Sequence, residues 1–410
     1  MWNVKENRMY YNKKTIKQKM GVNVKKIFVL LVLLFAITGC SKTVEFETIQ
    51  KSNTGFHKIN EAEKIDGGVI YYSGDNILFD KDGFTTELAN KVRDLWREDD
   101  EIYYDSNNVL YSFNFKTKET KKMVEKPYNI LGKYNGNIIS YYGRNIYSIN
   151  GTKKIKLFTG GYYLNEAVLY KNKVYGVPAV NVYEYNLDTL KVKKITKGSE
   201  MSYFEFVDKK LYIITKKKRN YVYYKLTDSG LKKNFVIENV MGVTEKTVKN
   251  GMFIETNKDY NEYTKGNQLL YVYDGKIKKV DSDYRYYMIG IVNNKFCYYK
   301  NEYNYGTYDK NLETFYLYDG KKKTKAFDLN VDNFEAIIGY EYDDGLLIEV
   351  VYESFTTLYK YDGKRIIKLD TPDNFYSIIG LEIVDNKAYI RYSDGEESFT
   401  SLGTIITLSW

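Results

Sequence analysis

The sequence predicts an all-β fold of short antiparallel strands. Three features indicate this fold: a recurring hairpin pattern, an abundance of tyrosine and almost no helical periodicity. The pattern is clearest at residues 358–364, LYKYDGK, where alternating aromatic and aliphatic side chains lead into Asp-Gly. Asp-Gly after such a run is typical of a type I′ hairpin turn, because that turn requires positive φ, which Gly tolerates. The 45 tyrosines, against only 3 prolines, agree with strands because Tyr favours half-buried pleated surfaces.

The hairpin pattern recurs along the chain. Close copies occupy residues 270–276 and 315–321, and looser copies occupy 77–80, 110–114, 146–151 and 182–186. A second pattern, a small polar or Gly pair followed by a β-rich run, opens each repeat. Its nine copies begin at residues 67, 100, 136, 172, 209, 250, 294, 344 and 386. A repeat of about 40 residues holding two hairpins is typical of a β-propeller, whose blades are four-stranded sheets around a channel.

Within each predicted blade, strands A to D follow in order from the axis outward. Nine A–B turns are present, but the chain ends at residues 405–410 with a strand-C pattern and no strand D. We therefore predict an all-β propeller of four-stranded blades over residues 65–410, with eight blades favoured and seven or nine as alternatives. Glycines inside the predicted A strands indicate close backbone approach at the axis. They are Gly242, Gly290, Gly339 and Gly380.

The start of the chain has the features of an export signal. Two lysines precede an apolar run of 11 residues at 27–37, and Thr-Gly-Cys follows. The run is shorter than the about 20 residues that a membrane-spanning helix needs, so we interpret residues 1–39 as a secretory signal peptide. Residues 40–64 are polar and weakly patterned, which predicts a tether. Met20 is an alternative start of translation.

The residues at the end of this signal, 37–40 with the letters ITGC, resemble the lipobox of bacterial lipoproteins. The resemblance implies that Cys40 becomes lipidated and that the exported protein is anchored in the membrane, on the outer face of the cell membrane. A plain secretory peptide with an incidental cysteine is the alternative.

Charge and cysteine content restrict the partners. The formal net charge is +9, but residues 1–39 hold eight of the Lys and Arg residues and one acid. The remaining 54 basic and 52 acidic residues leave about +2, which gives no support for a nucleic-acid partner. Cys297 is the only cysteine besides Cys40, so no disulfide is expected, and its strand pattern suits a buried, inert thiol. We expect a monomer.

Most catalytic constellations cannot form from this sequence. His57 is the single histidine and lies in the predicted tether, which excludes a Ser-His-Asp triad or a His-ligated zinc within one chain. No Gly-rich phosphate loop is present, and we expect no cofactor and no metal. Acids at residues 99–101 and 343–344 could serve a glycosidase or bind calcium, but both sets lie at A–B turns, where Asp suits the backbone geometry.

Over residues 65–410 the chain looks like the propeller lipoproteins of clostridia-like Gram-positive bacteria. The resemblance is to the repeat architecture and implies a membrane-anchored cell-surface repeat protein; most members of that group have no assigned activity. The Ser-x-Asp-x-Gly-x-Thr-Trp boxes of sialidases and the Trp-rich docking repeats of quinoprotein dehydrogenases are missing.

Loop length points to one working face. The B–C loops lengthen in the sixth to eighth repeats and are rich in Tyr. Loops on a rigid scaffold often carry function, and Tyr offers a large contact area with few rotamers to freeze. We call the candidate ligand-binding residues the long-loop tyrosines. They are Tyr260, Tyr263, Tyr303, Tyr305, Tyr308 and Tyr352.

The sequence therefore favours a binding module for an extracellular protein or glycan. The alternative is a propeller enzyme, a hydrolase or lyase acting on an envelope or extracellular polysaccharide. Paired carboxylates on the long-loop rim, one with a raised pKa, would favour the enzyme, and an uncharged aromatic rim would favour binding. A compositional bias toward Tyr would explain the loops without any function.

Overall fold

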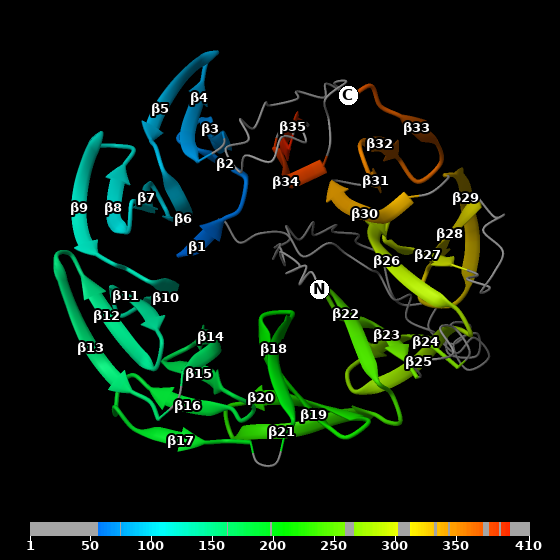
Figure 1. Cartoon of the computed structure of the whole chain (residues 1–410), viewed down its shortest axis with the longest axis horizontal. Helices are drawn as coiled ribbons and strands as arrows, with labels where there is room; N and C mark the ends of the chain where they lie inside the picture. Colours follow the sequence, from blue (N-terminus) through cyan, green and yellow to red (C-terminus); the bar gives the residue numbers. More distant parts are fainter. Residues whose placement is uncertain are drawn as a thin grey trace, which may run out of the picture.

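The chain forms a ring of antiparallel sheets around a central axis (Figure 1). The computed structural model describes residues 56–393 except 74, 162, 197–198, 259–265, 302–311, 332–333, 343–344, 372–376 and 385–386. Among these residues, none belongs to a helix long and apolar enough to span a membrane. In each sheet the first strand lies toward the axis and the last lies at the outside, as a β-propeller requires.

Eight sheets of four or five strands, numbered here as blades, follow in chain order. Blade 1 holds β2 (Ala62–Ile65), β3 (Gly68–Ser73), β4 (Asn76–Lys81) and β5 (Phe84–Ala89). Blade 2 holds β1 (His57–Ile59), β6 (Val92–Glu98), β7 (Glu101–Ser106), β8 (Val109–Asn114) and β9 (Glu119–Glu125). Blade 3 holds β10 (Asn129–Tyr134), β11 (Asn137–Tyr142), β12 (Asn145–Asn150) and β13 (Lys153–Thr159). Blade 4 holds β14 (Leu164–Tyr170), β15 (Lys173–Pro178), β16 (Tyr183–Asn186) and β17 (Val192–Lys194).

The second half of the ring repeats this order. Blade 5 holds β18 (Met201–Val207), β19 (Lys210–Lys217), β20 (Asn220–Thr227) and β21 (Gly230–Ile237). Blade 6 holds β22 (Gly242–Val248), β23 (Gly251–Asn257), β24 (Gln268–Tyr273) and β25 (Lys276–Ser282). Blade 7 holds β26 (Arg285–Val292), β27 (Lys295–Asn301), β28 (Leu312–Tyr318) and β29 (Lys323–Asn330). Blade 8 holds β30 (Phe334–Tyr342), β31 (Gly345–Tyr352), β32 (Thr356–Tyr361) and β33 (Ile366–Lys368).

A two-stranded sheet, β34 (Ser377–Val384) and β35 (Lys387–Ser393), fills the position between blade 8 and blade 1. Leu381 and Ile390 pack on Leu347 of blade 8, and β34 lies against β2. The rings of Tyr71 and Tyr389 meet at 5.4 Å across the junction with blade 1. The predicted all-β propeller is confirmed, and side-chain packing of β34 and β35 on blade 1 closes the ring.

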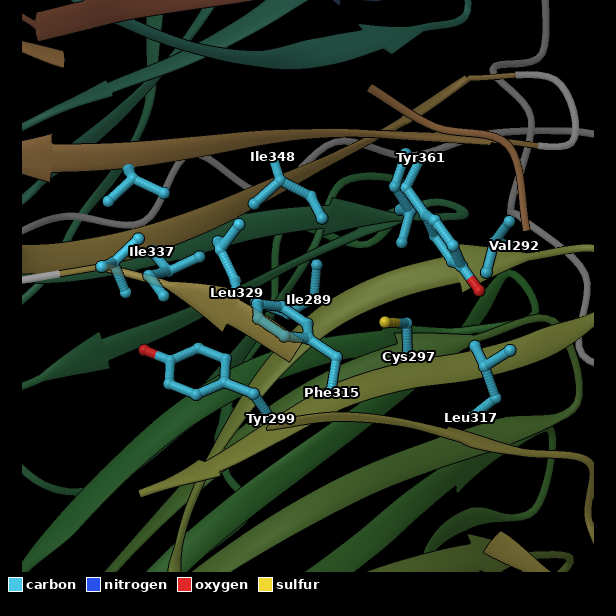
Figure 2. Packing of buried hydrophobic residues seen from close by; sticks show 13 residues of the cluster. Ile289, Val292, Cys297, Tyr299, Phe315, Leu317, Leu329, Ile337, Ile348 and Tyr361 are labelled. Carbon is cyan, nitrogen blue, oxygen red and sulfur yellow. The ribbon is translucent and has the colours of Figure 1, made fainter. Parts of the chain in front are cut away.

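Apolar side chains between neighbouring blades form the core. Figure 2 shows the cluster between blades 7 and 8, where Cys297, Phe315 and Tyr361 lie among Ile and Leu side chains. Cys297 is a free thiol with no exposed surface, and burial raises its pKa far above the ordinary value. It is therefore held neutral, as a packing residue would be.

The prediction of close backbone approach at the axial glycines is confirmed at one position and wrong at another. A Cβ at Gly339 would lie 2.4 Å from the carbonyl oxygen of Ile289 in the neighbouring A strand, so close backbone approach is confirmed there. A Cβ at Gly290 would meet Leu346 at 2.7 Å. The prediction is wrong for Gly242, because a Cβ there would have no neighbour within 4 Å. Packing at Gly380 lies outside the described side chains.

The copies of the predicted type I′ turn do not all have the same geometry. Asp274 and Gly275 both have positive φ, at 46° and 75°. In the copy at Asp362, however, the carboxylate oxygen Oδ1 accepts hydrogen bonds from the N–H groups of Lys364 and Arg365, both at 2.7 Å. This Asx-type turn is longer than a two-residue loop, and it still lets β32 and β33 pair.

The boundary of the tether was placed wrongly. Residues 57–64 form β1 and most of β2, and β1 pairs with β6 as a fifth, innermost strand of blade 2. The carboxylate of Glu63, only 5% exposed, lies 2.9 Å from Nε2 of His57 and accepts a hydrogen bond from Arg97 at 2.8 Å. The segment looked like a tether because its partners come from β6, which lies well beyond it in the sequence.

Candidate binding rim

The two rims of the ring carry different connections. The B–C loops and the connectors between blades lie on one rim, here called the B–C rim, and the A–B and C–D turns lie on the other, the A–B rim. Of the predicted site residues, only Tyr352 is described. The other long-loop tyrosines and Cys40 lie outside the described residues.

Tyr352 ends β31 at the B–C rim. Its ring stacks on Phe355 with centroids 4.3 Å apart and planes inclined by 12°, and its N–H donates to the Phe355 carbonyl at 2.9 Å. Tyr352 is half-buried against the core of blades 7 and 8, whereas Phe355 is 48% exposed. The ring that faces solvent in this loop is therefore Phe355.

A second aromatic group lies on the same rim at blade 3. Blade 3 lies across the ring from blade 8 (Figure 1). We call this group the blade-3 rim cluster. It consists of Tyr128, Tyr142, Arg144, Tyr147, Lys154 and Tyr163.

A two-residue turn between β11 and β12 organises this cluster. Tyr142 pairs with Asn145, and Gly143 has φ of 60° while Arg144 keeps negative φ, as in a type II′ turn. The positive φ favours glycine at this position, and a Cβ there would lie 3.1 Å from the ring of Tyr163, which would have to shift by a few tenths of an ångström. The N–H of Leu164 donates to the Gly143 carbonyl at 2.7 Å, which ties the blade 3–4 connector to the turn.

Tyr128, in the connector from blade 2 to blade 3, supports Tyr142 from the other side. The two rings stack with centroids 4.3 Å apart and planes inclined by 13°. Tyr128 has φ of 64°, which is uncommon for a bulky residue and costs conformational energy of order 1 kcal/mol or more. Aromatic stacking of about 0.5–1.5 kcal/mol offsets that cost. Contacts with the surrounding structure thus stabilise Tyr128 in a backbone conformation that tyrosine rarely adopts.

Lys154 completes the cluster from β13. Its Nζ lies 4.7 Å from the ring centroid of Tyr128 and donates to the carbonyls of Glu125 and Lys126 at 2.8 and 3.0 Å. Burial, and then the positive charge of Lys126, lower the pKa of Lys154. The ammonium is fixed beside the rings, and an added negative charge would be favourable there.

The sequence analysis did not identify this cluster, because it looked for long B–C loops. The B–C loop of blade 3 is only a two-residue turn. The available signals were local: Tyr128 follows one of only three prolines, and Tyr142 precedes a glycine in a tight turn. Nothing in the sequence indicates that these separate residues stack.

Two cavities open on the A–B rim. One, of about 310 Å³, lies between blades 5 and 6 and is lined by Tyr212, Phe235 and Tyr273. The other, of about 320 Å³, lies between blades 2 and 3 and is lined by Tyr103 and Ile138. Both are inter-blade crevices on the face opposite the blade-3 rim cluster.

Two glutamates, the buried Glu349 and the half-buried Glu255, have raised pKa values. Burial raises the pKa of Glu255 and of Glu349 to about 7. Glu255 accepts a hydrogen bond from the Tyr286 N–H at 2.9 Å, and Glu349 accepts one from the Ile378 N–H at 3.0 Å. Each therefore binds an N–H near the start of the A strand in the next sheet, and the two carboxylates belong to different blades. Their contacts are those of structural caps rather than of a catalytic pair.

The acids at the A–B turns are likewise engaged. Asp99 has φ of 51°, as the turn geometry requires, and the carboxylate of Asp100 pairs with Lys116. Glu101 accepts a hydrogen bond from the Tyr103 hydroxyl at 2.6 Å. Residues 343–344 lie outside the described residues. Within the described part of the chain, no group of three or more His, Cys, Asp or Glu side chains could hold a metal ion.

Comparisons with known proteins give the fold alone. No family model matches the chain, and no characterised protein matches it in sequence. A crystal structure of a eukaryotic initiation factor superposes with a TM-score of 0.50 at 11% identity, covering 78% of this chain and 91% of that one. The β-propeller domain of the Trilobed protease from Pyrococcus furiosus gives 0.40 at 15% identity, covering 82% and 94%. The tricorn protease gives 0.40 at 12% identity, and the match covers 85% of this chain but only 42% of the tricorn chain.

Proposed function

We propose that this propeller is a binding module whose B–C rim takes an extracellular protein or glycan ligand. The observation that carries the proposal is the stack of Tyr142 on Tyr128, with Tyr142 56% exposed and its support held in a strained backbone conformation. Strain of this kind persists only where the surrounding structure imposes it, and it occurs preferentially at functional positions. A ring fixed before binding loses little conformational entropy when a ligand arrives.

The proposal includes export and lipid anchoring at Cys40, as the lipobox resemblance implies. An anchor at the N-terminal end would leave the propeller outside the cell as a scaffold for recognition. The aromatic B–C rim favours binding over the alternative of a polysaccharide-cleaving enzyme, because the carboxylates with raised pKa cap strands instead of pairing with each other.

A binding assay with matched tyrosine variants tests the proposal. The full-length protein is titrated against purified envelope proteins and, separately, against purified cell-wall glycans. Truncation of Tyr142 to Ala should weaken binding by about 2 kcal/mol or more, as expected for a central aromatic anchor. Tyr273→Ala is the control, because Tyr273 is similarly exposed, at 48%, but lines the cavity on the A–B rim. Equal binding by wild type and Tyr142→Ala, together with a loss in Tyr273→Ala, would move the working face to the A–B rim.

A further inference from the structure

Two exposed aromatic rings flank a single turn in the blade-3 rim cluster. Tyr142 is 56% exposed and Tyr163 is 74% exposed. Tyr142 stacks on Tyr128 of the preceding connector, and Tyr163 lies against Gly143 from the following connector. Tyr142 therefore presents a flat surface to solvent with its ring held by the stack on Tyr128, and the exposed Tyr163 lies on the other side of the turn.

The shape of this surface discriminates between kinds of ligand. Protein partners are usually anchored by an aromatic or Arg side chain that fills a desolvated pocket. The cavities between blades 2 and 3 and between blades 5 and 6 open on the A–B rim and not beside these rings. An exposed flat ring instead suits a sugar, because the C–H face of a pyranose carries partial positive charge and packs on the negative face of an aromatic ring. The sugar hydroxyls meanwhile stay in water.

The charges around the rings are mainly positive. Arg144 is exposed within the turn, Lys126 is exposed in the preceding connector, and Lys154 lies against the Tyr128 ring. The neighbouring acid Glu125 is paired with Lys122 at 3.2 Å. Another acid, Glu166 of β14 in blade 4, lies near Tyr141 of β11, whose pKa is raised by burial first and by the charge of Glu166 second. An anion at the turn would relieve the repulsion between Lys126 and Lys154 and could bind the guanidinium of Arg144 through two parallel hydrogen bonds.

We infer that the blade-3 rim cluster binds an acidic saccharide, with the apolar face of a sugar ring on Tyr142 and the acid group at Arg144 and Lys126. The inference rests on the proposed function, because it assumes that the B–C rim is the ligand-binding face. It adds the class of ligand and the roles of the individual residues.

The test uses saccharides that differ only in charge. The full chain in detergent is titrated calorimetrically with oligogalacturonate and with its uncharged methyl ester, and with sialylated and phosphate-bearing oligosaccharides beside their neutral parents. The acidic member of each bound pair should bind about tenfold more tightly, and the preference should shrink as salt is raised. Tyr142→Ala should lower affinity for both members about 30-fold, because stacking does not depend on charge.

The variant Arg144→Gln tests the contribution of the Arg144 charge. This variant should lose the tenfold preference for the acid and bind the neutral saccharide as the wild type does. Tyr273→Ala and an unchanged melting temperature serve as controls for general damage. Equal affinity for acid and ester, or no binding of any acidic saccharide, would overturn the inference. If a purified envelope protein then bound in a Tyr142-dependent manner, the proposed function would stand while the inference failed. If no envelope component required Tyr142, both would fail.

Discussion

Ionisation of Glu349 should make the stability of the propeller depend on pH. A single substitution at this position can measure that contribution. The side chain is 1% exposed in β31. Its Oε2 accepts a hydrogen bond from the Tyr340 hydroxyl at 2.7 Å, and its Oε1 accepts one from the Ile378 N–H at 3.0 Å. Burial raises the pKa of the carboxyl from 4.5 to about 7, and the two hydrogen bonds offset this only in part.

The sign of the effect follows from the direction of that shift. Because the pKa is higher in the folded protein than in the unfolded chain, folding is favoured when the carboxyl is protonated. The stabilisation is fully present below pH 4.5 and is lost as the pH rises through about 7. The difference between the pKa values of Glu349 in the folded and unfolded protein corresponds to at most about 3 kcal/mol of unfolding free energy.

The substitution Glu349→Gln keeps an acceptor for the Ile378 N–H but cannot ionise. We expect the variant and the wild type to melt at similar temperatures near pH 5. The variant should be the more stable at pH 8, where the wild type carries a buried charge. For a chain of this length 1 kcal/mol corresponds to about 1–2 °C, so the difference should reach several degrees.

Thermal unfolding followed by circular dichroism at pH 5, 6, 7 and 8 measures this difference. Other titrating groups are common to both proteins and cancel. The control Glu349→Ala leaves the Ile378 N–H and the Tyr340 hydroxyl without this acceptor, and it should destabilise at every pH. A difference between wild type and Glu349→Gln that stays constant from pH 5 to pH 8 would refute the reasoning.

Three further predictions concern the axis, the anchor and the long loops. Gly339→Ala forces a Cβ against the Ile289 carbonyl and should destabilise by about 1–3 kcal/mol, whereas Gly242→Ala, with no neighbour within 4 Å, should be neutral or slightly stabilising in the same urea titration. Cys40→Ala should release the protein from the membrane fraction or leave it unprocessed, and unchanged fractionation and processing would exclude lipidation. Alanine variants of the five long-loop tyrosines other than Tyr352 should keep the wild-type melting temperature, as expected for loop side chains that contribute little to stability. Tyr352→Ala should lower it, because Tyr352 is half-buried against the core of blades 7 and 8. If ligand affinity is unchanged in all six variants, the tyrosines in these loops reflect the high tyrosine content of the whole chain. The ligand then binds elsewhere on the ring.

The repeat architecture could be predicted because its signals are local. Alternation in runs such as Leu270–Tyr273 and the Asp274-Gly275 turn specify a hairpin from neighbouring residues alone, and their recurrence specifies a ring of such hairpins. Lysines also occupy the outer strands, for example the exposed Lys193 and Lys194 of β17, where lysine hinders edge-to-edge pairing with another sheet.

The candidate site could not be predicted in this way. The turn at Gly143 was readable as a hairpin, but its neighbours Tyr128 and Tyr163 come from two different inter-blade connectors. Whether those rings stack on the turn depends on the angle between adjacent blades, which no short sequence window contains. Loop length does not reveal such a surface, because a rigid scaffold can assemble one from very short connections.

By itself the sequence determined the strand periodicity, the turns and the propeller class, since each depends on contacts between residues close in the chain. Only the tertiary structure decided that residues 57–64 belong to the propeller and that Tyr71 meets Tyr389 to close the ring. It also decided which tyrosines gather into one surface. Those outcomes depend on contacts between segments far apart in sequence, whose formation is set by the packing of whole blades and not by any local pattern.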